Sequence, residues 1–109
     1  MSEQDRALIE EFRRRLPSDI VPHIKDVIMY GSRARGDADA DSDLDLVALV
    51  DENSVILEQK LDDIVYNLMW DHDFKLIISL KVFSEQRFLA AAAKGYSYYR
   101  NIVREGISV

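Results

Sequence analysis

The chain has 109 residues, of which 48% are hydrophobic and 31% are charged, and its formal net charge is −6. This composition is typical of a folded domain and excludes a disordered chain or a generally basic nucleic-acid-binding surface, while the lack of cysteine excludes disulfides and thiolate zinc sites. The N-terminus "MSEQDRALIEEF" lacks the pattern of a signal peptide, and no segment approaches the roughly 18 apolar residues of a membrane helix. We therefore expect a cytoplasmic single domain over residues 1–109. It should contact neither membrane nor nucleic acid directly.

The first predicted elements are a helix and a strand. Ser2 and Asp5 resemble a capping box, and apolar residues recur at helical spacing from there until Pro17, which predicts an amphipathic helix. The apolar run "VIMY" over 27–30 ends at Gly31. A buried strand followed by a sharp turn is therefore expected there.

A second strand and a long helix are predicted next. Residues 44–51 form an apolar run, and Asn53 follows as a candidate cap for a helix that ends near His72. The stretch "FKLIISLKVF" over 74–83 is rich in β-branched residues and partly alternating, so it predicts a third strand.

Two helices complete the chain. Ser84 is predicted to cap the first of them, with Phe83 and Phe88 as a hydrophobic staple and Gly95 as the C-terminal stop. A last short helix is expected before Gly106. Strands that alternate with helices predict a two-layer α/β (α+β) arrangement.

Aspartates occupy every second position at the start of the second predicted strand: Asp37, Asp39, Asp41, Asp43 and Asp45. Residues two apart on a strand point to the same face, roughly 7 Å apart. Asp43 and Asp45 should therefore project together, while the opposite face is apolar, with Leu44, Leu46, Ala48 and Val50. The first three aspartates follow Gly36 among small residues and are expected in a solvated loop.

A pair of adjacent carboxylates repels itself unless cations neutralise it. Magnesium fits best, because it takes oxygen ligands and is usually held by one or two carboxylates together with substrate phosphates. Two such ions can activate an attacking oxygen and stabilise a leaving one in nucleotidyl transfer. An Asp-x-Asp pair alone also fits an ordinary strand whose acids face solvent.

The segment "GSRARG" directly follows the first strand and offers an anion-binding turn. Backbone N–H groups and the hydroxyl of Ser32 would face an incoming phosphate, and Gly31 lets the backbone approach closely. Arg33 or Arg35 could add positive charge for a triphosphate, although a surface or structural role is equally open.

Together these motifs resemble a known family. Gly31-Ser32, ten residues, and then Asp43-Leu44-Asp45 are similar to the signature of the DNA polymerase beta-type nucleotidyltransferase superfamily, in its small branch of minimal nucleotidyltransferases. The resemblance implies a nucleotidyltransferase fold, with a small mixed sheet and helices on one face. It also implies that ATP donates AMP to a hydroxyl, with Asp43 and Asp45 holding two Mg²⁺ ions and Gly31 and Ser32 holding the phosphates.

The superfamily usually supplies a third carboxylate from a neighbouring strand. The positions on one face of the predicted third strand are Asp73, Lys75, Ile77, Ser79 and Lys81. Asp73 is the acid among them, so we choose it as the third catalytic and metal-binding residue. The alternatives are that Asp73 is a polar residue of the connection "WDHDF" and that the third acid is missing.

The resemblance also implies a partner. The small branch is similar to antitoxins that act with a HEPN-domain toxin (higher eukaryotes and prokaryotes nucleotide-binding), a ribonuclease to whose tyrosine they add AMP. Two alternatives remain: a non-catalytic antitoxin that neutralises the toxin by binding, and a nucleotidyltransferase for a small molecule of the aminoglycoside type. Trp70, at the end of the long helix, is expected in the core or at a partner contact.

Overall fold

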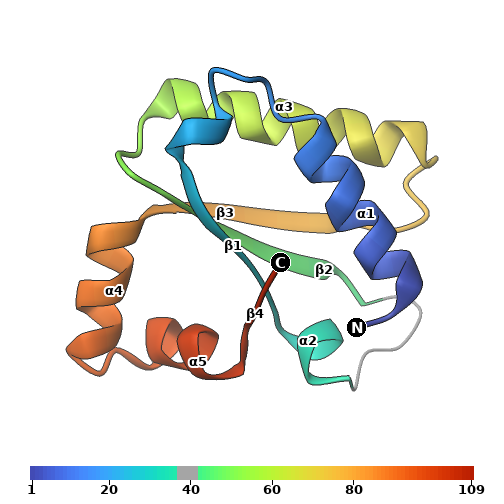
Figure 1. The fold of residues 1–109 in the computed structure, drawn as a ribbon. Coiled ribbons are helices and arrows are strands. Elements are labelled where there is room, and N and C mark those ends of the chain that lie inside the picture. The colour runs from blue at the N-terminus through green and yellow to red at the C-terminus, as the bar shows by residue number, and fades with distance from the viewer. Residues whose placement is uncertain (37–41) are drawn as a thin grey trace.

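A four-stranded mixed sheet forms the centre of the molecule (Figure 1). The computed structural model describes residues 1–36 and 42–109, so the loop expected for Asp37, Asp39 and Asp41 lies outside the described residues. The strands are β1 (Ile24–Tyr30), β2 (Leu44–Val50), β3 (Ile78–Ser84) and β4 (Ile107–Ser108), in the spatial order β3-β2-β1-β4. β1 pairs antiparallel with β2 and β4, whereas β2 and β3 run parallel.

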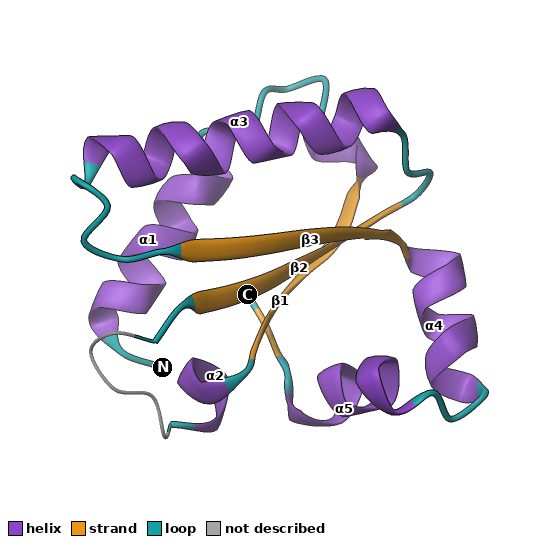
Figure 2. Ribbon diagram, turned by 180° about the vertical axis from the view of Figure 1, so that it is seen from behind, coloured by secondary structure: helices purple, strands orange, loops and turns teal. Residues whose placement is uncertain are grey.

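Helices cover both faces of this sheet. They are α1 (Glu3–Arg14), α2 (Ser32–Arg35), α3 (Val55–Asp71), α4 (Glu85–Ala93) and α5 (Ser97–Glu105). Figures 1 and 2 show α1 and α3 on one side of the sheet and α4 and α5 on the other. The predicted fold class is confirmed, with the addition that α4 and α5 pack on the face opposite α1 and α3. Within the described residues, none of the helices has the length and apolar character needed to cross a membrane.

Strand β2 is buried on both faces. Its residues Leu44, Leu46, Ala48 and Val50 belong to the core cluster under α1 and α3, as the sequence predicts. Val47 and Leu49 point the other way, where Phe88 of α4 and Ile102 of α5 cover them. Asp45 shares this second face at the start of the strand and stays partly exposed. Burial of the rest of β2 therefore fixes the position of the Asp45 carboxylate.

Most predicted caps are confirmed. The hydroxyl of Ser2 accepts a hydrogen bond from the backbone N–H of Asp5, and that of Ser84 accepts one from Arg87. The rings of Phe83 and Phe88 lie 5.5 Å apart between centroids, as expected for the staple.

Other features of the fold differ from the prediction. Ser54, not Asn53, caps α3, because its hydroxyl accepts from the N–H of Leu57. The third strand begins at Ile78 and not at 74, since the chain first makes a tight turn through Phe74. The short strand β4 was not predicted, because two residues carry no periodic pattern.

Candidate active site

The turn after β1 lies directly against the carboxylate of Asp45. Tyr30, the last residue of β1, pairs with Asp45 across the antiparallel ladder, and Gly31 then turns the chain into α2 with φ 76° and ψ −158°. A Cβ atom on Gly31 would lie only 2.4 Å from Oδ2 of Asp45. Position 31 therefore requires glycine, both because φ is positive and because a Cβ atom would not fit beside Asp45. The sheet thus brings together the two motifs that are ten residues apart in sequence.

The two predicted metal-binding carboxylates differ in their surroundings. Asp43 is exposed just before β2, whereas Asp45 is partly buried. Burial raises the pKa of Asp45, and the negative charge of Asp43 raises it further. Lys81 on β3 and Arg35 on α2 act in the opposite direction. Ionised Asp45 is therefore unfavourable in the metal-free protein, and a cation that takes oxygen ligands would relieve this cost, so the donor set fits Mg²⁺.

Within residues 1–36 and 42–109, the third carboxylate is not found beside this pair. Among the described residues, no group of three or more His, Asp or Glu side chains could hold a metal ion, so Asp73 does not form such a group with Asp43 and Asp45. Asp73 lies exposed in the turn between α3 and β3, with φ 56°. Opposite Asp45 on β3 lies Ser79, with Lys81 two residues further on. The neighbouring strand therefore presents a hydroxyl and an ammonium group on this side.

Arg33 points into the protein. Its Nη1 atom lies 3.0 Å from Oδ1 of Asp5 in α1, and the two side chains are 11% and 3% exposed. Its Nε donates to the carbonyl oxygen of Ser42 at 3.0 Å. Arg33 therefore ties α1 and α2 to the backbone that leads into Asp43, which is a structural role. Its contact with a phosphate stays a prediction. The sequence did not indicate that Asp5 forms a buried ion pair, because its spacing from Ser2 matches a helix cap.

Arg35 lies on the exposed side of α2. Its guanidinium is 3.9 Å from the carboxylate of Glu105, and both side chains are about half exposed, at 46% and 41%. A pocket of about 260 Å³ adjoins it, lined by Tyr30, Gly31, Arg35, Tyr98, Asn101, Ile102 and Glu105. No local pattern in the sequence indicates this pocket, since α5 reaches the turn only through the tertiary fold.

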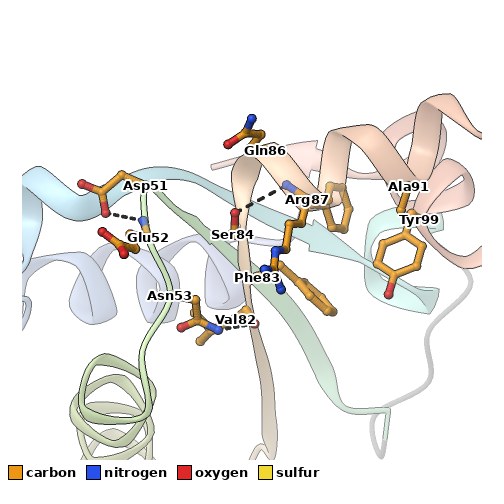
Figure 3. A pocket seen from close by; sticks show the side chains of 11 residues that line it. Asp51, Glu52, Asn53, Val82, Phe83, Ser84, Gln86, Arg87, Ala91 and Tyr99 are labelled. Carbon is orange, nitrogen blue, oxygen red and sulfur yellow. Dashed lines mark hydrogen bonds between the residues drawn. The ribbon is translucent and has the colours of Figure 1, made fainter.

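A second pocket, of about 690 Å³, lies at the other end of the sheet (Figure 3). It is lined where β2 and β3 end, by residues that include Asp51, Asn53, Arg87 and Tyr99. At roughly 3.3 Å per strand residue, Asp51 is about 20 Å from Asp45 along β2. In addition, Asp51 is hydrogen-bonded to the ring of His23 at 2.9 Å. This pocket is therefore separate from the predicted site.

The comparison with protein families agrees with this geometry. The sequence model described as "Nucleotidyltransferase domain" matches residues 6–104. The chain therefore belongs to the nucleotidyltransferase domain family, and its general activity is that of a nucleotidyltransferase. A comparison with curated proteins finds no match.

Arg33 and Arg35 should differ in their contribution to stability. Arg33→Ala should lower the free energy of unfolding by about 3–5 kcal/mol, because it leaves the buried carboxylate of Asp5 uncompensated. The matched variant Arg35→Ala removes an exposed arginine and should change it by less than about 1 kcal/mol. Denaturant unfolding of both variants measures this difference. Equal losses would contradict the structural role of Arg33.

A second prediction concerns pH. Because the pKa of Asp45 is raised in the folded protein, the folded state holds this proton more tightly than the unfolded chain does. The contribution of Asp45 to stability should therefore fall as pH rises from about 3.9, the ordinary pKa of aspartate, up to the raised value. In the presence of a chelator, Asp45→Asn should be more stable than the wild type at pH 7.5, and this difference should shrink toward pH 4. Thermal unfolding at several pH values tests this, and a gain that is independent of pH would contradict the cause given.

Proposed function

We propose that this chain transfers AMP from ATP to a tyrosine hydroxyl of a HEPN-domain toxin and thereby acts as its antitoxin. The observation that supports transfer most is the contact between Gly31 and the carboxylate of Asp45. This contact places the turn, with the hydroxyl of Ser32, beside two carboxylates at the start of β2. A triphosphate on the turn and a metal ion on the carboxylates would then be neighbours.

Each residue of the site has a role in this proposal. Asp43 and Asp45 would hold Mg²⁺, and the triphosphate would supply further oxygen ligands. When bound, the metal supplies neutralisation of phosphate charge and activation of the attacking oxygen. Ser32 donates its hydroxyl to a phosphate oxygen, and Arg35 adds positive charge beside it. The pocket next to Arg35 offers space for the nucleoside.

The reaction joins the acceptor oxygen to the α-phosphorus of ATP. The bond from this phosphorus to the β-phosphate oxygen breaks, pyrophosphate leaves, and the hydroxyl proton passes to solvent. The partially buried position of Asp45 supports this chemistry, because electrostatic interactions are stronger where water is partly excluded.

The acceptor is proposed from the resemblance to minimal nucleotidyltransferases. The net charge of −6 is consistent with it, because an acidic protein and a basic RNA-cutting partner have complementary potentials. Such steering favours docking of the toxin in the correct orientation.

One observation favours a second candidate, a non-catalytic antitoxin that neutralises the toxin by binding. β3 presents Ser79 and Lys81 next to Asp45, and no group of three acidic or histidine side chains among the described residues could hold a metal ion. A site with two carboxylates could bind a nucleotide without transferring it efficiently. The two candidates differ in whether the toxin carries AMP.

Intact-mass spectrometry distinguishes these candidates. The wild type, mixed with a HEPN-domain toxin, ATP and Mg²⁺, should add the mass of one AMP to that toxin and silence its ribonuclease activity. Asp43→Asn/Asp45→Asn should remain folded and lose transfer by on the order of 100-fold or more, because metal binding is lost. Asp19→Asn, which removes an exposed carboxylate outside the site, serves as the control.

The binding candidate makes the opposite prediction. If the folded double variant protects as well as the wild type and no adduct forms with any of the four nucleoside triphosphates, the proposed transfer is wrong.

A further inference from the structure

Three aromatic side chains form an exposed patch at the C-terminal end of α3. Tyr66, Trp70 and Phe74 are 52%, 63% and 38% exposed. Their rings contact one another, with centroids 6.4 Å apart for Tyr66–Trp70, 5.7 Å for Tyr66–Phe74 and 6.0 Å for Trp70–Phe74. Exposed aromatic groups in mutual contact are typical of protein interfaces, where they provide a large contact area. We call these three residues the aromatic patch.

The backbone is strained where it completes this patch. Asp73 and Phe74 have φ values of 56° and 54°, so two successive residues other than glycine adopt the left-handed conformation. A bulky residue rarely does so, and such strain is concentrated at functional positions. Here the turn brings the ring of Phe74 back onto Trp70 and Tyr66. Because that ring remains more than a third exposed, the fold alone gains little from it.

Acidic side chains precede the aromatic patch on α3. Asp63 and Asp62 lie one turn before Tyr66, at helical spacings of three and four, and both are exposed. Burial raises the pKa of Asp62, and the neighbouring carboxylates of Glu58 and Asp63 raise it further. Lys60 on the same helix is paired with Asp19 at 3.7 Å. The outer face of α3 therefore combines apolar area with negative potential.

The aromatic patch lies at the same end of the sheet as the candidate active site. Phe74 is four residues before Ile78, the first residue of β3, which pairs with Leu44 of β2. The N–H of Leu44 donates to the carbonyl of Ile77 at 2.8 Å, and Ile77 is itself 44% exposed. Figure 1 shows the last turn of α3 and the beginnings of β2 and β3 at this end of the molecule.

We propose that the aromatic patch, with the acidic face of α3 beside it, is the docking surface for a protein partner that presents basic and apolar side chains. Charge complementarity favours such a partner over a second copy of this chain, because a two-fold interface would bring the acidic faces of two copies together. A docked partner would lie at the same end of the sheet as Asp43 and Asp45. Its role as the acceptor of AMP rests on the proposed function, whereas docking itself requires no catalysis.

Site-specific photo-crosslinking identifies the occupant. A benzophenone amino acid is placed at Tyr66 and, as a matched control, at Tyr96, which is 59% exposed on the other side of the molecule. In the native cells, the probe at 66 should crosslink to one basic protein that mass spectrometry identifies, and the probe at 96 should not. Crosslinks only to a second copy, or none that depend on position 66, would overturn the proposal.

Binding of the identified protein is then measured by the emission of Trp70, the single tryptophan of the chain. Emission should shift to shorter wavelength on binding, since Trp70 loses contact with water. Tyr66→Ala should weaken the affinity at least tenfold and Tyr96→Ala should not change it, while raising NaCl from about 50 to 200 mM should weaken binding of the wild type. Equal affinity of the two variants, or independence of salt, would contradict the proposal.

The same proteins separate this proposal from the proposed function. Tyr66→Ala should keep the thermal stabilisation by Mg²⁺ and a non-hydrolysable ATP analogue, because it does not touch that site. Asp43→Asn should bind the partner as the wild type does. If the partner docks on the aromatic patch but never receives AMP, the docking surface stands and the proposed transfer fails.

Discussion

The organisation of the candidate active site depends on the close approach of Gly31 to the carboxylate of Asp45. This approach follows from the antiparallel pairing of β1 and β2, which sets the end of one strand against the start of the other. A residue with a side chain at position 31 would collide with the carboxylate and would also need an unfavourable backbone conformation. The turn and the acidic pair are therefore parts of one structure.

Around this contact, some residues stabilise the fold and others form the candidate active site. The ion pair of Asp5 and Arg33 is almost fully buried and ties α1 to α2 and to the backbone at Ser42. Apolar residues on both faces of β2 fix the rest of the strand. The negative charge of Asp43 raises the pKa of Asp45, and the positive charges of Lys81 and Arg35 lower it. The fold thus supports a local negative charge that favours cation binding.

The sequence predicts the parts of this structure that depend on local patterns. Helical spacing, the caps Ser2 and Ser84, and the alternation of Asp43 and Asp45 with apolar residues all report on neighbours in the chain. The partner of Arg33 is 28 residues away and its character as a buried ion pair arises only in the tertiary fold. The turn at Phe74 was missed for a different reason, because β-branched and aromatic residues around it favour a strand and the left-handed conformation leaves no pattern in the sequence. Long-range packing therefore determines the Asp5–Arg33 ion pair and the turn at Phe74, which local propensity does not predict.

The central claim is that Gly31, Ser32, Asp43 and Asp45 form one site for a metal ion and a triphosphate. Paramagnetic broadening of the amide NMR signals by Mn²⁺, in the presence of a non-hydrolysable ATP analogue, tests it most directly. Signals of the turn 31–33, of 43–46 and of the start of β3 should broaden first and together. Broadening that begins at the other acidic groups, around Asp51 and Glu52 or around Asp62 and Asp63, would contradict it.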